Sequence, residues 1–215
     1  TCALPILKED PLEKFDAGLS DLIDNDETPE LTDKLKEIKF AGAENYRILY
    51  EKDSPDAYKD GDIYFAQVNG SRIPLNNTKV NNYLLNIKYL KLKDYVTYKA
   101  TAEDLQKYGL DAPELKVTAS YTAENEEGEE KEETFILNIS RDPAERKAAE
   151  EAAVKAGEEE NKKEGSASAE KDEEKITAYA RVGESGIIYK ITPEEYKKLI
   201  AASVDSFRHP EVLPV

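Results

Sequence analysis

A pair of short strands followed at once by a helix occurs twice in this chain of 215 residues, and this repeated order constrains the fold more than any other feature. The first copy reads IYFAQVNGSRIPLNNTKVNNYLL from Ile63, and the second reads TAYARVGESGIIYKITPEEYKKLI from Thr177. Asn69-Gly70 is a dipeptide that accepts the positive φ angles of a tight hairpin turn. Thr192-Pro193-Glu194-Glu195 combines an N-cap threonine, an early proline and the glutamate of a capping box. Each copy is therefore expected to be a β-hairpin closed by a helix.

A further hairpin is predicted ahead of each copy. The strands LKEIKF and YRILYEK are joined around Gly42, and the strands LKVTASYT and ETFILNIS are joined by an acidic turn, so that Leu115–Thr122 should pair with Thr134–Ser140. The fold class that follows is α+β, with two similar units of antiparallel β-hairpins, each closed by a helix. The expected division is 1–34 as an N-terminal helix and acidic loop, 35–111 as the first unit and 112–215 as the second.

Apolar residues at helical spacing from Leu12 to Ile23 predict the N-terminal helix. This helix matches the last helix of the chain at a constant offset, which pairs Phe15 with Tyr196 and Pro29 with Pro210. We therefore interpret residues 1–34 as the tail of a preceding unit.

The segment 141–175 departs from the repeat, because it holds no aromatic residue and Val154 is its only large aliphatic one. Alanine, glutamate and lysine favour a helix from about Asp142 to Lys155, and the composition after Gly157 is that of a solvated loop. It is expected to be a charged surface insertion between two neighbouring strands.

The stretch QKYGLDAPELKVTASYT, Gln106–Thr122, is rich in residues that end and begin secondary structure. Thr101 opens a short helix with a capping arrangement, and Gly109 stands where a helix ends in a left-handed residue. Pro113 then forces an extended backbone on the residue before it. Each residue has a structural role, so we interpret the stretch as a junction and not as a site.

Three segments, LQKYGLDAPELKVTASYT, IPLNNTKVNNYLLNIKYL and SFRHPEVLP, resemble the DUF4340 family of bacterial proteins of unknown function. The resemblance spans roughly Leu35 to Pro214. It implies an exported protein, tethered by an N-terminal membrane anchor and built of two or more extracytoplasmic units. Because some members are encoded beside transporter-like genes, association with a transporter is a further expectation. The family has no established catalytic residues, so the resemblance implies none, and its members usually have a short turn in place of 141–175.

Charge and composition limit the kinds of partner. The formal net charge is −16, from 46 acidic and 30 basic side chains, and such a surface repels nucleic acid and anionic lipid headgroups. No run of about 20 apolar residues is present to span a membrane. The chain has no methionine, even at position 1, so we expect it to be a segment of a longer protein whose anchor lies upstream. Cys2 is the only cysteine and is interpreted as an ordinary residue near a cut end.

Residues with reactive side chains do not form a recognisable catalytic motif. His209 is the only histidine, and its place past a helix end favours a contact with free carbonyls over a metal or a catalytic triad. The loop Asp24-Asn25-Asp26-Glu27 lacks the glycine and distal glutamate of a complete calcium loop, and Asp60-Gly61-Asp62 is expected to be a turn. We expect no catalytic residue, no metal and no cofactor.

Tyrosine is the one enriched aromatic residue, with 13 copies and no tryptophan. Four copies that no strand or helix face clearly requires are candidates for an exposed binding patch, or they cover half-buried sheet edges: Tyr58, Tyr64, Tyr95 and Tyr98. The leading functional hypothesis is a non-enzymatic, extracytoplasmic, membrane-tethered binding or scaffold module for an unknown protein or envelope component. The alternatives are a carboxylate-dependent hydrolase acting on envelope glycans and a calcium-stabilised adhesion module.

Overall fold

The computed structural model describes residues 26–124, 128–149, 151 and 176–210. The helix expected within 12–23 and Cys2 lie outside these residues, and so does most of the expected tail of a preceding unit. Among the described helices, none is both long enough and apolar enough to cross a membrane.

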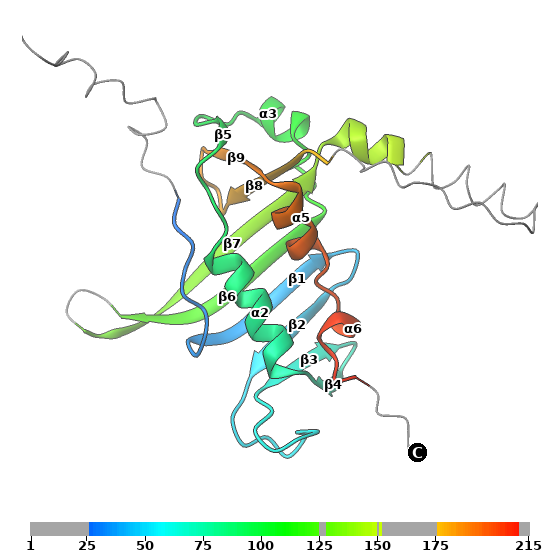
Figure 1. The fold of residues 1–215 in the computed structure, drawn as a ribbon. Coiled ribbons are helices and arrows are strands. Elements are labelled where there is room, and N and C mark those ends of the chain that lie inside the picture. The colour runs from blue at the N-terminus through cyan, green and yellow to red at the C-terminus, as the bar shows by residue number, and fades with distance from the viewer. Residues whose placement is uncertain (1–25, 125–127, 150, 152–175, 211–215) are drawn as a thin grey trace, which may run out of the picture.

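The chain folds as α+β around one antiparallel sheet (Figure 1), in the strand order β4-β3-β2-β1-β6-β7-β8-β9-β5. The strands are β1 (Leu35–Gly42), β2 (Tyr46–Tyr50), β3 (Tyr64–Val68), β4 (Ser71–Pro74), β5 (Tyr95–Thr97), β6 (Leu115–Glu124), β7 (Glu130–Arg141), β8 (Ala178–Val182) and β9 (Ile188–Ile191). The predicted pairing of Leu115–Thr122 with Thr134–Ser140 is confirmed, because Val117 lies opposite Leu137 and Ala119 opposite Phe135.

The hairpin between β3 and β4 confirms the turn that the sequence predicts. Asn69 and Gly70 have φ angles of 48° and 82°, the left-handed geometry that a two-residue hairpin turn requires. Val68 pairs with Ser71 directly across this turn. The two turn residues, Asn69 and Gly70, therefore determine the register in which β3 and β4 pair.

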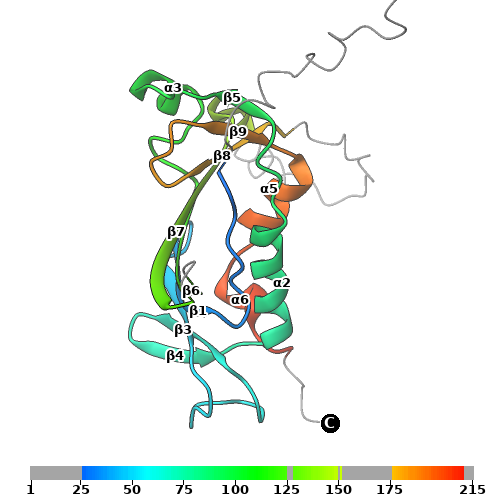
Figure 2. The ribbon, with the colours of Figure 1, turned by 90° about the vertical axis from the view of Figure 1, so that its left-hand side faces the viewer.

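Three helices cover one face of the sheet (Figure 2): α2 (Asn77–Lys88), α5 (Pro193–Ile200) and α6 (Val204–Phe207). The side chain of Asn76 caps α2 by accepting a hydrogen bond from the Lys79 backbone. The side chains that α2 buries lie three and four residues apart, the spacing of one helix face; they are Val80, Tyr83, Leu84 and Ile87. The expected capping box of Thr192 and Glu195 opens α5.

The last helix is shorter than its apolar spacing predicts. That spacing places Val204 and Phe207 on the helix that Thr192 begins, but α5 ends at Ile200 and Ser203 caps a separate helix. The Ser203 hydroxyl accepts a hydrogen bond from the Ser206 backbone at 3.1 Å. This second cap redirects the chain, and the ring of Phe207 packs edge-on against Tyr83 of α2 at 5.5 Å.

The two expected units share one sheet and one hydrophobic core. β1 and β6 lie on either side of the expected boundary at 111/112, and they pair from Gly42 opposite Leu115 to Leu35 opposite Tyr121. The segment after α2 crosses to the second half, where β5 pairs with β9. The segment after α5 crosses to the first half, where the Asn76 N–H donates to the Phe207 carbonyl at 2.9 Å. The core cluster accordingly draws on strands from both halves.

The junction around Gly109 has the expected geometry. Thr101 and Asp104 form a capping box at the start of α3 (Ala102–Lys107), and Gly109 has a φ of +70°. The Leu110 N–H then donates to the Leu105 carbonyl at 2.7 Å. Leu110 is buried in a small cluster with Tyr179 of β8 and Ile188 of β9. The junction therefore attaches α3 to the second half of the sheet.

The beginning of the 141–175 segment is bonded to the strand that follows it. Residues 143–149 and 151 are helical, in agreement with the start of the expected helix, and the remainder, 152–175, lies outside the described residues. Both carboxylate oxygens of Glu145 accept hydrogen bonds from Thr177, at 2.7 Å from its backbone nitrogen and 2.8 Å from its hydroxyl. The first turn of the segment is therefore part of the packed fold.

Candidate functional site

The four candidate tyrosines do not form one patch, because Tyr64 is fully buried. It lies on β3, which is flanked by β2 and β4 and has buried residues on both faces at 64–66. Its hydroxyl donates to Asn81 Oδ1 of α2 at 2.7 Å, and its ring packs edge-on against Tyr50. The expectation that Tyr64 is exposed is wrong, because a helix covers a strand face that the sequence leaves unassigned.

The other three tyrosines divide between the two ends of the sheet. Tyr58 is 59% exposed, follows β2, and its ring lies 5.1 Å from that of His209. Tyr95 and Tyr98 lie in and just after β5, at the opposite edge of the sheet, with ring centroids 6.3 Å apart. Only Tyr95 and Tyr98 are therefore brought together.

A larger exposed surface surrounds this second pair. Among the described residues, the exposed large hydrophobic side chains are Tyr58, Tyr89, Val96 and Tyr98. Three of these four lie between positions 89 and 98, and Tyr89 is the most exposed, at 67%. Sequence reasoning missed Tyr89, although one signal was present: it lies off the helical stripe of Val80, Leu84 and Ile87. We call the chain between α2 and β5, residues 89–94, the connection.

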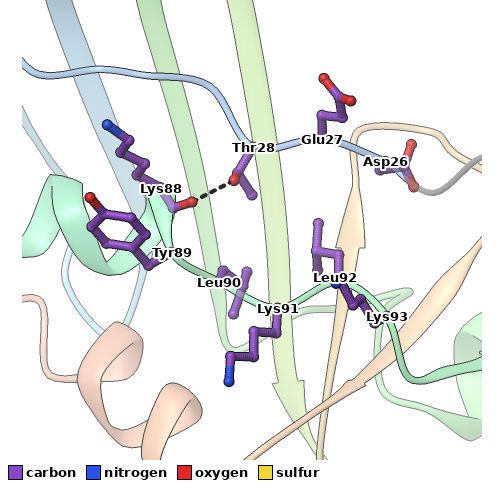
Figure 3. A pocket seen from close by; sticks show the side chains of 9 residues that line it. All are labelled: Asp26, Glu27, Thr28, Lys88, Tyr89, Leu90, Lys91, Leu92 and Lys93. Atoms are coloured by element: carbon purple, nitrogen blue, oxygen red, sulfur yellow. Dashed lines mark hydrogen bonds between the residues drawn. The ribbon is translucent and has the colours of Figure 1, made fainter.

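The connection has one apolar and one charged side. Leu90 and Leu92 are buried, at 6% and 5% exposure, and they alternate with the exposed Lys91 and Lys93. Figure 3 shows Lys91 and Leu92 on opposite sides of the chain. The Lys91 N–H donates to Glu195 Oε1 at 3.2 Å, which ties the connection to the start of α5. Both lysines are therefore held outward by the burial of their neighbours.

Residues 26–28 form the opposite wall of a cavity of about 630 Å³ beside the connection. The Thr28 hydroxyl donates to the Lys88 carbonyl at 2.8 Å (Figure 3), and Glu30 forms an ion pair with the Lys88 ammonium group. The Asp26 carboxylate accepts hydrogen bonds from the hydroxyls of Tyr189 and Ser185, at 2.9 and 2.8 Å. These hydrogen bonds of Asp26 attach this wall of the cavity to β9 and to the turn before it.

Two smaller cavities adjoin the connection on its α5 side. One, of about 310 Å³, is lined by Tyr89, Thr192 and Glu194 among others, and the second, of about 340 Å³, by Lys93, Lys190 and Ile191 among others. Lys91 lines all three cavities. All three cavities therefore adjoin the connection.

Glu195, the acid bonded to the connection, is suited to accepting hydrogen bonds rather than to donating a proton. Although burial raises the pKa of Glu195, the hydrogen bonds from Thr192 and Lys91 outweigh it and lower this pKa below its usual value. Within the described residues, no group of three or more histidine, cysteine, aspartate or glutamate side chains is placed to hold a metal ion. Asp24 and Asn25 of the acidic loop lie outside those residues. What the arrangement offers chemically is recognition by tyrosine rings and lysine ammonium groups.

His209 lies far from the connection and contacts a carboxylate, not the free carbonyls expected from its place after a helix. Its Nε2 is 3.1 Å from Asp62 Oδ2, and both side chains are largely buried. Asp62 also accepts the Lys59 N–H at 2.8 Å within the expected turn, where Gly61 has a φ of +86°. This contact fastens the C-terminal segment to the loop between β2 and β3.

Comparison with known families identifies the chain. A family described as "Domain of unknown function (DUF4340)" matches residues 66–215. The chain belongs to the DUF4340 family. The match confirms the resemblance and begins within β3, later than Leu35, so it includes the connection and the whole second half of the sheet. No curated protein and no solved structure matches the chain.

Proposed function

We propose that this DUF4340 chain is a non-enzymatic binding or scaffold module that works outside the cytoplasm while tethered to a bacterial membrane. In this proposal it holds a protein or another envelope component, and a transporter is the candidate assembly. One observation carries the proposal: three of the four exposed large hydrophobic side chains of the described residues lie within ten residues of chain, and one of them, Tyr89, lines two surface cavities. We call Tyr89, Val96 and Tyr98, with Lys91 and Lys93, the connection surface.

The composition of the connection surface is that of an interaction site. Exposed tyrosine is enriched where proteins bind partners, because its ring offers a large apolar area and its hydroxyl a hydrogen bond. The two lysines add a local positive charge to a molecule whose net charge is −16, and charge of one sign within a field of the other orients a partner. The buried Leu90 and Leu92 fix the backbone beneath, so little conformational freedom is lost on binding.

The alternative, a carboxylate-dependent hydrolase, receives less support. Such an enzyme needs a carboxyl group whose pKa is raised, so that it can protonate a leaving group. Among the described acids with a shifted pKa, all are shifted downward: Glu37, Asp104, Glu145 and Glu195. The calcium-stabilised module would require millimolar calcium to raise the thermal unfolding temperature and chelator to lower it.

We also infer that the two halves of the sheet are copies of one unit. Each half is a row of four strands in sequence order, counted outward from the β1–β6 pair, followed by a helix. β3 and β8 share the same burial pattern along their five residues. In an experimental structure, superposing β3 and β4 on β8 and β9 should place α2 on α5, and a helix on the opposite face would refute the duplication.

The proposed surface can be tested by photo-crosslinking in the cell that produces the protein. A photoreactive phenylalanine derivative at position 89 or 98 should form one specific adduct with an envelope component. The same residue at position 58 is the matched control, because Tyr58 is similarly exposed but lies at the other end of the sheet. An identical adduct from all three positions, or none from 89 and 98, would refute the connection surface. Release of the adduct with the cytoplasmic fraction would refute the proposed location.

A further inference from the structure

Three lysines from two separate elements converge on one of the cavities beside the connection. Lys91 and Lys93 come from the connection and Lys190 from β9, and all three line the cavity of about 340 Å³. The Lys190 N–H donates to the Asp94 carbonyl at 2.6 Å, which fixes the two elements next to each other. We call this hollow the lysine cavity.

Within the described part of the chain, none of the three ammonium groups belongs to a close ion pair, unlike Lys88, which pairs with Glu30. The Lys91 charge does attract the Glu195 carboxylate, whereas Lys93 and Lys190 have no such partner among the described residues. Two carboxylates also line the cavity, those of Asp94 and Glu195. The Glu195 carboxylate is already engaged, since it accepts hydrogen bonds from the Thr192 N–H at 2.9 Å and the Thr192 hydroxyl at 2.8 Å. These hydrogen bonds leave the Glu195 charge in place, so three positive and two negative side chains line the cavity and positive charge predominates.

Gathering like charges costs free energy unless an opposite charge binds among them. The chain has sixteen more acidic than basic side chains. Of the two carboxylates that line the lysine cavity, Asp94 is the one for which no side-chain hydrogen bond is described. Folding does not require the three lysines, because each is exposed at the surface. An anionic ligand group would relieve their mutual repulsion.

The remaining lining of the cavity is apolar. Ile191 is buried at 3% exposure, Ile176 is half-buried, and Pro193 at the start of α5 completes this side. A cavity of this size lies at the lower end of the range of about 300–1,000 Å³ for small-ligand sites. Inorganic phosphate would leave the apolar side uncovered, whereas an anion carrying a hydrocarbon portion would use both kinds of lining.

Taking these observations together, we propose that the lysine cavity binds an anionic amphiphile, that is, a phosphate or carboxylate group attached to a hydrocarbon chain. This inference rests on the proposed function, because it assigns a ligand class to the same region of the molecule. The lysines bind the anionic group, and Ile176, Ile191 and Pro193 contact the chain. Free amphiphiles and lipids of a bilayer share this chemistry.

The test is titration calorimetry of the purified protein with short-chain dihexanoyl phosphatidylglycerol, and with inorganic phosphate for comparison. The lipid should bind and inorganic phosphate should bind much more weakly. Lys93→Gln and Lys190→Gln should each weaken lipid binding about threefold to fivefold, the effect of one exposed ion pair. Asp94→Asn should instead strengthen binding, because it removes a negative charge beside the anion.

Matched controls separate the cavity from the overall charge. Lys116→Gln and Asp111→Asn change the net charge by the same amounts at exposed positions outside the cavity, and they should leave the affinity unchanged. Equal weakening by Lys93→Gln and Lys116→Gln would overturn the proposal, and so would the absence of lipid binding or equal affinity for inorganic phosphate.

Vesicles of phosphatidylcholine with and without phosphatidylglycerol distinguish the two sources of the ligand. If the protein sediments with the anionic vesicles, and Lys93→Gln reduces this sedimentation, the ligand is a lipid of a bilayer. If the protein binds the short-chain lipid but not the vesicles, the ligand is a free amphiphile. Both results support the cavity. Because this assay needs no protein partner, its failure leaves the crosslinking result at positions 89 and 98 intact, and a negative crosslinking result does not alter the titration.

Discussion

A methyl group added at Gly109 should destabilise the protein far more than the same change at Gly70. Both glycines have left-handed backbones, with φ angles of +70° and +82°. They differ in what surrounds them. A Cβ at Gly70 meets no atom within 4 Å, whereas a Cβ at Gly109 would lie 2.8 Å from Ser140 Oγ and 3.1 Å from Pro143 Cγ. The two positions therefore separate backbone strain from steric crowding.

The magnitudes follow from these two contributions. A left-handed conformation costs a residue with a Cβ about 1–2 kcal/mol, which is the whole expected effect of Gly70→Ala. Gly109→Ala adds crowding against Ser140, which is fully buried and has no free space to move into. Overpacking of this kind costs about 1–3 kcal/mol. We expect Gly109→Ala to lower the free energy of unfolding by about 2–5 kcal/mol.

Urea unfolding followed by circular dichroism measures both variants, provided that the slope against urea concentration does not change. Ser140→Ala keeps the Cβ but removes the oxygen nearest to the new methyl group, so Gly109→Ala should cost less in that background. Equal costs for Gly109→Ala and Gly70→Ala would refute the reasoning. Asparagine, which tolerates left-handed geometry, should also cost more at 109 than at 70, because its Cβ meets the same atoms.

Two further predictions concern titrating groups. Burial above all raises the pKa of Tyr64 to about 12, whereas an unfolded tyrosine ionises near pH ~10. The stability that the neutral Tyr64 side chain gives the folded state is therefore complete below pH ~10, and it is lost as the pH rises through ~12. Tyr64→Phe should move the alkaline unfolding midpoint, followed by circular dichroism, to higher pH, and Tyr58→Phe should not; equal midpoints for both would contradict this. Burial raises the pKa of Glu145, but its hydrogen bonds with Thr177 and the Arg141 charge outweigh that effect and lower it below its usual value. Glu145→Ala should cost about 1–2 kcal/mol near neutral pH. The cost should shrink as the pH falls below ~4, the usual glutamate pKa, and should vanish only below the lowered pKa of the folded state, where the carboxylate is protonated in both states. A cost independent of pH, or equal to that of the exposed Glu151→Ala, would refute it.

Local features of this fold could be predicted because few residues decide them. Asn69-Gly70 determines its turn, Thr192 and Glu195 determine the start of α5, and Gly109 determines the end of α3. The pairings between strands of different hairpins could not be predicted in this way. The pairing of β1 with β6, and of β5 with β9, depends on packing between segments that are distant in the sequence.

The same distinction between local and long-range contacts decides which parts of the candidate site could be predicted. The candidates Tyr95 and Tyr98 do lie together, since they share one short segment. Tyr64 was misplaced because its exposure depends on α2, which covers β3 from elsewhere in the chain. The lysine cavity could not be predicted from the sequence at all. Lys190 reaches Lys91 and Lys93 only through the pairing of the last strand with an edge strand from the first half.

The exchange of segments between the two halves has a consequence for how the chain folds. β5 completes the far edge of the second half, and α6 packs on α2 of the first, so neither half reaches its final packing alone. Such a topology has a high contact order, and chains of this kind fold slowly because distant segments must meet before contacts stabilise them. During synthesis, the side of α2 that contacts Phe207 stays uncovered until residue 207 has emerged. The core of the described residues therefore reaches its final packing only after α6 has been made.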